Sequence, residues 1–169
     1  MTNDTIAFVA NLALTLSVII ALVFGVVQIR AAARDRRERF ALEALHNFQT
    51  REFVELLQYV IAHQLPSTFQ ESRALATEDQ TLMIQFAQQM ESLGILVAQR
   101  YITMDLVDRT LGSFVVTSWK KYKPMILDMR ETQKDPFASE YFQWLAERID
   151  ERMRNSPRRP FHETGGRSR

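Results

Sequence analysis

The stretch that decides the fold is Ile6 to Ile29, IAFVANLALTLSVIIALVFGVVQI, which carries no charged side chain. A helix rises about 1.5 Å per residue, so the segment from Ile6 to Val27 would cover roughly 33 Å. The hydrocarbon layer of a bilayer is about 30 Å thick. Because lipid offers the backbone no hydrogen-bonding partner, a single spanning segment has to be helical. The sequence therefore predicts a transmembrane helix over residues 6–29.

Basic residues directly after this segment predict its orientation. Residues 1–5 form a short polar leader, whereas five arginines follow the apolar run: Arg30, Arg34, Arg36, Arg37 and Arg39. Lys and Arg close to the end of a span remain on the cytoplasmic side. They also attract anionic headgroups, at about 1 kcal/mol each near the surface. We expect the N-terminus outside and the rest of the chain in the cytoplasm, in a bacterial inner membrane with the lipid bilayer as a partner.

A cleaved signal peptide is the main alternative, because Ala31-Ala32-Ala33 offers small residues of the kind that signal peptidase prefers. The leader, however, has no basic residue, and the apolar run is longer than the 7–15 residues that are typical of signal peptides. Arg30 also separates the run from the supposed cleavage site. A retained anchor is the favoured interpretation.

The composition limits the chemistry of the remaining chain. The 169 residues have a net charge of +1, so no overall field attracts nucleic acid, and we expect no nucleic-acid partner. There is no cysteine, which excludes disulfides, thiolate nucleophiles and cysteine-based metal sites. With five glycines and five prolines, the chain favours helices joined by short loops.

Apolar residues recur at helical spacing through most of the chain after the anchor. We expect a basic juxtamembrane helix over 30–47, then a helix over 51–63 with Thr50 as its N-cap. Residues 65–76 are predicted to be the longest loop. Thr77-Glu78-Asp79-Gln80 has the pattern of a capping box and predicts a helix over 78–99.

Further helices are expected in the second half of the chain. Thr103 is a candidate N-cap for the next one, and Pro124 is predicted to interrupt it or to begin another over 125–131. Asp135-Pro136 predicts the start of a last helix over 137–154. Residues 155–169 have no periodicity and are predicted to be a disordered basic tail. The expected fold is all-α: a transmembrane helix that continues into an irregular bundle of about four or five cytoplasmic helices, with a domain over 48–154.

No set of residues has the spacing of a catalytic or metal site. His46, His63 and His162 are far apart, and neither HExxH nor a glycine-rich phosphate loop is present. We therefore expect no enzymatic activity, no cofactor and no metal, and we identify no small-molecule substrate. A metal site made of His46, His63 and carboxylates remains open as an alternative.

Trp119-Lys120-Lys121-Tyr122 mixes aromatic and basic side chains, and Trp144 adds a second large aromatic residue. Such residues are enriched at binding surfaces, so these five form a possible interaction surface. Lysines near a helix end also interact favourably with the helix dipole, which is the simpler explanation.

The chain resembles an uncharacterised family of small bacterial proteins that is described as a domain of unknown function. The resemblance covers roughly residues 35–150. It is carried by Glu91-Ser-Leu-Gly94 with residues 102–107, by Trp119 with Pro124 and Arg130, and by residues 141–148, YFQWLAER. It implies one N-terminal membrane helix and an all-helical cytoplasmic region, with no activity, cofactor or catalytic residue. Gly94 is expected to permit a close helix contact, and Arg130 to bond to the end of a neighbouring helix.

These observations support three hypotheses about function. The first is a membrane-anchored interaction or scaffold module, without catalytic activity, that binds a protein partner or itself at the cytoplasmic face. The second is a membrane effector of a stress or phage-defence response that acts through an oligomerising transmembrane helix. The third is an enzyme with an unrecognised carboxylate or histidine site.

Overall fold

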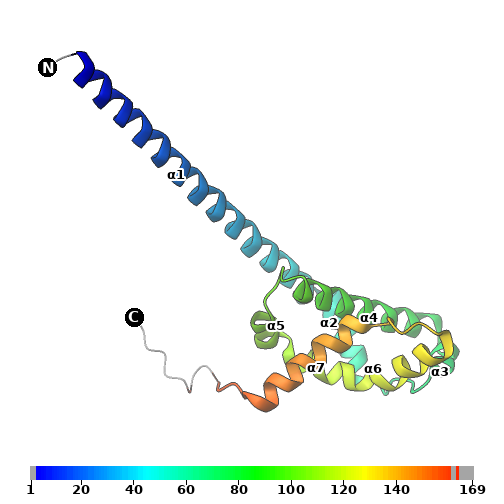
Figure 1. The fold of residues 1–169 in the computed structure, drawn as a ribbon. Coiled ribbons are helices and arrows are strands. Elements are labelled where there is room, and N and C mark those ends of the chain that lie inside the picture. The colour runs from blue at the N-terminus through cyan, green and yellow to red at the C-terminus, as the bar shows by residue number, and fades with distance from the viewer. Residues whose placement is uncertain (1–2, 161–162, 164–169) are drawn as a thin grey trace. The chain divides into compact units, whose positions relative to one another are not determined.

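The structure is a computed structural model, and it describes residues 3–160 and residue 163. All regular structure in this part of the chain is helical, which confirms the all-α class. The chain divides into two compact units, residues 1–44 and residues 45–169. Figure 1 shows the elements of both units.

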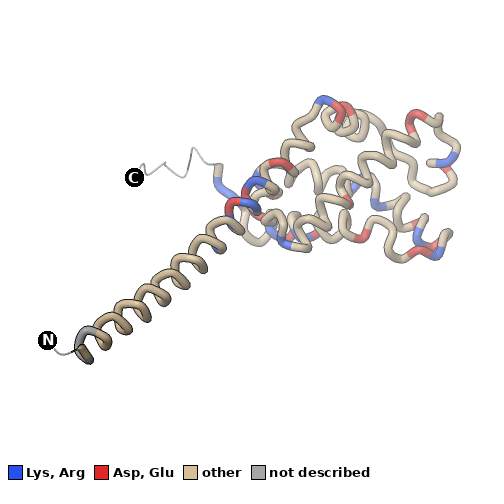
Figure 2. Tube along the Cα trace, turned by 90° about the horizontal axis from the view of Figure 1, so that it is seen from above, with Lys and Arg blue, Asp and Glu red and all other residues tan. Residues whose placement is uncertain are grey.

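The first unit is a single long helix, α1, Asn3–His46. Its most apolar 18-residue window has a mean hydropathy of 2.6 and no buried residue, so α1 is long and apolar enough to cross a membrane. Figure 2 shows this stretch without acidic or basic residues, which begin again at Arg30. The prediction that the helix continues without a break to about residue 47 is confirmed, because α1 ends at His46.

The second unit is a bundle of short and long helices that follow a 3-10 turn, η1, Asn47–Gln49. The helices are α2 (Arg51–Ala62), α3 (Phe69–Ala74), α4 (Thr77–Ala98), α5 (Met104–Thr110), α6 (Gly112–Gln133) and α7 (Glu140–Asn155). The helix α7 packs against α4 and α6, whereas α2 packs against α4 and α3 against α6. The bundle has more helices than the predicted four or five, because α3 was not expected and the helix expected from Thr103 is divided at Leu111 into α5 and α6.

Two of the predicted N-caps are confirmed. The Thr50 hydroxyl accepts a hydrogen bond from the Phe53 amide at 3.2 Å, at the start of α2. The Thr103 hydroxyl accepts one from the Leu106 amide at 3.3 Å, at the start of α5. Both caps satisfy amide groups that have no partner within their own helix.

The predicted loop over 65–76 is wrong in part, because it contains α3. This short helix begins with a capping box, in which the Thr68 hydroxyl accepts from the Glu71 amide and the Glu71 carboxylate accepts from the Thr68 amide. The box predicted at Thr77 is also wrong. Ala76 is the N-cap of α4, and the Gln80 side chain donates instead to carbonyl groups at the end of α3.

Pro124 does not interrupt the chain as predicted, because α6 runs through it from Gly112 to Gln133. The carbonyl of Lys120 loses its partner at Pro124, but both residues are exposed, so solvent can reach this group. The break lies at Leu111, between α5 and α6. A Cβ on Gly112 would lie 2.8 Å from the Asp108 carboxylate, so the Asp108 side chain would have to move to accommodate it.

The last helix starts later than predicted, at Glu140 rather than at residue 137. Asp135 accepts a hydrogen bond from the Phe137 amide at 3.1 Å, so Asp135-Pro136 begins a turn and not the helix. Phe137 is 68% exposed and does not belong to the apolar stripe. Ser139 adopts φ 53° and does not cap α7 with its side chain.

The beginning of the tail predicted to be disordered contacts the bundle. Arg158 donates to the Asp108 carbonyl at 2.7 Å, and its guanidinium lies 3.3 Å from the Asp108 carboxylate. That carboxylate is only 2% exposed, and Arg152 Nε also lies 3.9 Å from it. The tail as far as Arg158 is therefore attached to the bundle by the interaction of Arg158 with Asp108. Most of the rest of the predicted tail lies outside the described residues.

Aromatic rings form the centre of the bundle. The ring of Phe142 on α7 meets Trp119 edge to face at 5.3 Å and Tyr122 at 5.9 Å. Phe86 on α4 stacks on Tyr122 at 5.8 Å and on Phe53 at 6.1 Å. Such pairs add about 0.5–1.5 kcal/mol each beyond the burial of their area. This cluster joins α2, α4, α6 and α7 into one core.

Candidate functional site

The predicted interaction surface is not a surface in the structure. Trp119 is 4% exposed and Tyr122 is 1% exposed, so both belong to the aromatic core. Their helix, α6, has neighbours on several sides, and the helical spacing of 119 and 122 turns both rings inward. Trp144 is half-buried, and Lys120 is exposed and lies 3.7 Å from Asp150.

Lys121 has a structural partner instead of an open surface. Its ammonium donates to three carbonyl oxygens at the end of α2, those of Val60 (2.8 Å), Ile61 (2.6 Å) and His63 (2.9 Å). An ammonium has three donors, and here all three are used. The side chain thus caps the C-terminus of α2, where the helix dipole favours a positive charge.

A second cap of this kind holds the N-terminus of α7. The Glu91 carboxylate on α4 accepts hydrogen bonds from the amides of Tyr141 at 3.1 Å and Phe142 at 2.8 Å. One turn later, Gly94 faces the backbone of Tyr141, and a Cβ on Gly94 would lie 2.6 Å from the Tyr141 carbonyl carbon. The expected close contact at Gly94 is confirmed, and it brings α4 near enough for Glu91 to reach α7.

Arg130 on α6 completes the attachment of α7. Its guanidinium donates to the Ala138 carbonyl at 3.0 and 2.8 Å and to the Gln143 side chain at 2.6 Å. The expectation that Arg130 bonds to the end of a neighbouring helix is therefore confirmed. Glu91, Gly94 and Arg130, which we call the α7 cradle, fix the first turn of α7 on α4 and α6.

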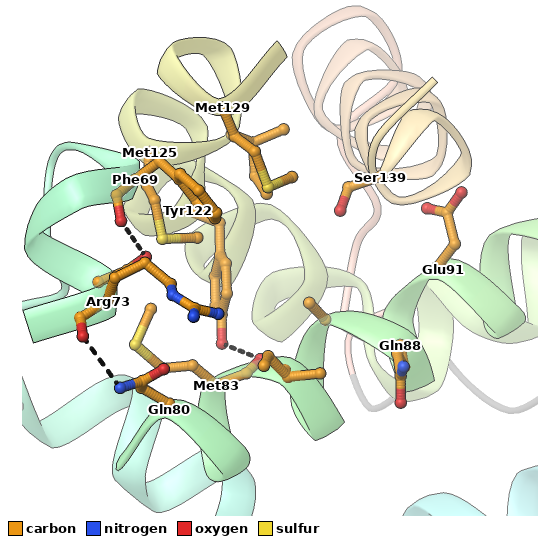
Figure 3. A pocket seen from close by; sticks show the side chains of 14 residues that line it. Phe69, Arg73, Gln80, Met83, Gln88, Glu91, Tyr122, Met125, Met129 and Ser139 are labelled. Carbon is orange, nitrogen blue, oxygen red and sulfur yellow. Dashed lines mark hydrogen bonds between the residues drawn. The ribbon is translucent and has the colours of Figure 1, made fainter. Parts of the chain in front are cut away.

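Next to the cradle, α3, α4 and α6 line a cavity of about 320 Å³ that is open to solvent on one side (Figure 3). Most of its wall is apolar and comes from side chains of these three helices: Phe69, Met83, Ile84, Ala87, Met125, Ile126 and Met129. Polar residues also line it: Ser72, Arg73, Gln80, Gln88, Glu91 and Ser139. An apolar cavity with a few polar groups at its rim is the usual form of a small-molecule site.

Tyr122 forms the floor of this cavity and belongs to the core at the same time. Its hydroxyl donates to the Met83 carbonyl at 2.9 Å, away from solvent. Burial, and to a smaller extent the neighbouring Tyr59, raises the pKa of Tyr122 well above its usual range. The pKa of Tyr59 is also raised, by burial and then by a hydrogen bond with Asp79. Tyr122 is therefore a neutral donor that supports the wall and not an acid–base group at neutral pH.

The charged groups around the cavity differ in whether they have hydrogen-bonding partners within the protein. The Glu91 oxygens accept the two α7 amides, and the Asp128 carboxylate accepts the Phe69 amide at 2.7 Å, which caps α3. Arg73 is different: its guanidinium makes no hydrogen bond or ion pair within residues 3–160 and 163. Figure 3 shows it extending from α3 in the direction of Tyr122, between Met83 and Met125.

The histidines do not come together. His63 stacks on Tyr59 at 4.5 Å and its Nδ1 lies 2.9 Å from the Tyr59 carbonyl, whereas His46 is exposed at the end of α1. Across the described residues, no three His, Asp or Glu side chains lie close enough to hold a metal ion. His162 lies outside the described residues.

The predicted topology residues lie along α1. Arg30, Arg34, Arg36 and Arg39 are exposed, and Arg34 pairs with Glu38 at 2.9 Å, one turn further on. The side chain of Arg37 lies outside the described residues. These basic side chains lie directly after the apolar stretch of α1.

Comparison with known proteins identifies the family. Residues 15–149 match the family described as Domain of unknown function (DUF4760). The chain belongs to this family. No match was found to a curated protein or to a solved structure. The matched residues of this DUF4760 protein include α1 from residue 15 onward and most of the bundle.

Sequence reasoning missed the cavity and two of its polar groups, Arg73 and Gln80. Both lie in or next to the segment that was expected to be a loop. A signal was present in residues 68–71, TFQE, which has the capping-box pattern and predicts a helix there. Without α3 there is no wall opposite α4, and hence no cavity to predict.

Proposed function

We propose that this DUF4760 protein is a membrane-anchored, non-enzymatic helical module that binds a protein partner or a second copy of itself at the cytoplasmic face. The observation that carries the proposal is the exposed apolar part of α1, in which no residue of the most apolar window is buried. Surrounding such a helix with water would be very costly, since burying apolar area contributes about 25 cal/mol per Å². A bilayer removes this cost.

The basic side chains of α1 support the orientation. Arg30, Arg34 and Arg36 are exposed in the first turns after Ile29, where anionic headgroups can reach them. The bundle then begins within the same chain, only a few turns later. The folded unit is thus tethered close to the inner surface of the membrane, where a bacterial cell offers many partners that diffuse in two dimensions.

The chain's lack of cysteine makes the anchor and its orientation directly testable. Asn3→Cys and Ser156→Cys place one thiol at an exposed position on each side of the proposed span. In intact cells, a membrane-impermeant maleimide should label the first variant only, and both after permeabilisation. Labelling of position 156 alone in intact cells would overturn the orientation, and release of the protein by alkaline carbonate would overturn the anchor.

Partner binding needs a separate experiment with the full-length protein. Purification from native membranes in mild detergent, followed by measurement of the mass of the complex, should yield a fixed ratio of a second protein or a defined oligomer. A variant lacking residues 6–29 is the control, because it keeps the bundle but loses the anchor. A strictly monomeric protein without a partner would contradict the proposal.

The membrane-effector alternative has less support from the described side chains. The hydroxyls of Thr15 and Ser17 donate to carbonyl groups of their own helix, at 2.8 Å each, and so do not need a neighbouring helix. Gly25 is the only glycine in the span, and no atom lies within 4 Å of the Cβ it would carry. Toxicity on overexpression that depends on residues 6–29 would favour the effector hypothesis over the scaffold.

A further inference from the structure

We propose that the cavity between α3, α4 and α6 binds a medium-chain carboxylic acid in its anionic form, with Arg73 as the counter-charge of the carboxylate. The ligand's carbon chain would lie along the apolar wall. This inference is independent of the partner-binding proposal, because it concerns a small molecule and a different part of the bundle.

The lining of the cavity fits an unbranched carbon chain. Three methionines, Met83, Met125 and Met129, line it together with Ile84 and Ile126. Methionine side chains are flexible and polarisable, so they adapt to apolar ligands of variable shape. The wall offers few directional polar groups, and this disfavours a sugar or a nucleotide, whose hydroxyl groups would lose their hydrogen bonds with water.

The rim of the cavity selects the charge of the ligand. Glu91, the acid that lines the cavity, already accepts two amide hydrogen bonds from α7. Asp128, which caps α3, accepts a hydrogen bond from the Phe69 amide. Arg73 is the charged lining residue whose side chain is unpaired within the described residues, and a guanidinium binds a carboxylate through two parallel hydrogen bonds.

The size of the cavity limits the length of the ligand. Its volume of about 320 Å³ lies at the lower end of the range of roughly 300–1,000 Å³ that ligand pockets occupy. A whole two-chain phospholipid is too large for it. A single carbon chain with a compact carboxylate is the amphiphile of fitting size, and octanoate is a suitable soluble probe.

The test uses the full chain in lipid nanodiscs and an octanoate analogue with a photoreactive diazirine at its far end. After illumination and proteolysis, mass spectrometry locates the attached label. We expect saturable labelling of the cavity segments 83–87 and 125–129, and loss of the label when octanoate is added as a competitor. Labelling of α1 or of the outer surface only, unaffected by octanoate, would overturn the proposal.

Variants and a neutral competitor distinguish binding that depends on the carboxylate charge from simple partitioning of the carbon chain into an apolar space. Arg73→Gln should weaken binding at least tenfold, because it removes the charge that pairs with the carboxylate, and Arg73→Lys should retain most of the binding. Arg51→Gln changes an exposed arginine outside the cavity and should have no effect. Octanol should compete at least tenfold less well than octanoate. Equal competition, or unchanged labelling of Arg73→Gln, would refute the role of the carboxylate.

A third variant tests the cavity itself. Ala87→Phe places a ring into the space that the carbon chain would occupy and should abolish labelling. Tryptophan fluorescence verifies that this variant is folded, since both tryptophans lie in the bundle. Full labelling of folded Ala87→Phe would show that the ligand binds elsewhere. Arg73 is exposed, so its substitution should not disturb the core. The Arg73 variants therefore test the proposed binding even if Ala87→Phe does not fold.

Discussion

Replacing Gly94 by alanine should separate α7 from α4, and the size of the effect follows from the geometry. The added Cβ would lie 2.6 Å from the Tyr141 carbonyl carbon, whereas ordinary contacts begin near 3.4 Å. The backbone of α7 must therefore retreat by about 0.8 Å, the difference between these two distances. The obstacle is backbone and not the end of a flexible side chain, so a rotation of side chains does not relieve it.

This displacement also breaks a hydrogen bond of the α7 cradle. The bond from the Phe142 amide to Glu91 would lengthen from 2.8 Å to about 3.6 Å, beyond hydrogen-bonding distance. A hydrogen bond to a charged group contributes about 1.5–3 kcal/mol, and overpacking costs about 1–3 kcal/mol. Alanine is favoured over glycine within a helix by about 1 kcal/mol, which offsets part of the loss. We expect Gly94→Ala to lower the free energy of unfolding by about 2–4 kcal/mol.

The assay is urea unfolding of the full chain in mild detergent, followed by tryptophan fluorescence. Trp119 and Trp144 both belong to the bundle, so the signal is independent of the helix in the micelle. With a slope of about 2 kcal/mol per M urea, the midpoint should fall by roughly 1–2 M. Gly25→Ala is the matched control and should leave the midpoint unchanged, because nothing lies within 4 Å of its Cβ. A Gly94→Ala protein as stable as the wild type would refute the close contact.

Three further results are expected from the same assay. Lys121→Met should lower the free energy of unfolding by about 2 kcal/mol, because it leaves three carbonyl groups at the end of α2 without their donor; an unchanged midpoint would contradict this cap. Burial raises the pKa of Tyr122 above that of an unfolded tyrosine, so the free energy of unfolding should be constant below about pH 10 and fall as the pH rises further. The fall should be less steep in Tyr122→Phe. Equal slopes in the two proteins would exclude Tyr122 as the cause. Arg158→Ala should lower the free energy of unfolding by about 1–2 kcal/mol, because it removes a charge beside the buried Asp108 carboxylate. Arg51→Ala, at an exposed position, should have a smaller effect. Equal effects of the two substitutions would count against the Arg158–Asp108 pair.

The sequence predicts those features of the fold that depend on neighbours along the chain. Thr50 and Thr103 cap the helices that follow them, because a cap needs only three or four residues to form. The same rule fails at Thr77, since the pattern T-x-x-E/Q occurs twice within a dozen residues and only the copy at Thr68 is used. The local pattern alone does not distinguish the copy at Thr68 from the copy at Thr77. What distinguishes them is the interaction of the Gln80 side chain with the end of α3.

Features that join distant parts of the chain could not be predicted in this way. Trp119 and Tyr122 were expected in a possible interaction surface because they flank Lys120 and Lys121, but packing by α4 and α7 makes both of them core residues. The caps supplied by Lys121 and Glu91 join residues about 50–60 positions apart, and nothing in the local sequence of either partner signals the other. The cavity has the same origin, because its walls come from three separate helices.

The interhelical caps have a consequence for how the bundle folds. The end of α2 and the start of α7 receive their caps from α6 and α4, so neither helix can satisfy these groups before its neighbours are in place. Short helices without caps are unstable in water, and these segments should remain largely unstructured as isolated peptides. Formation of the bundle should therefore be concerted, and its slowest amide hydrogens should exchange with solvent at a common rate set by global unfolding. Loss of one cap should therefore destabilise the whole unit rather than a single helix.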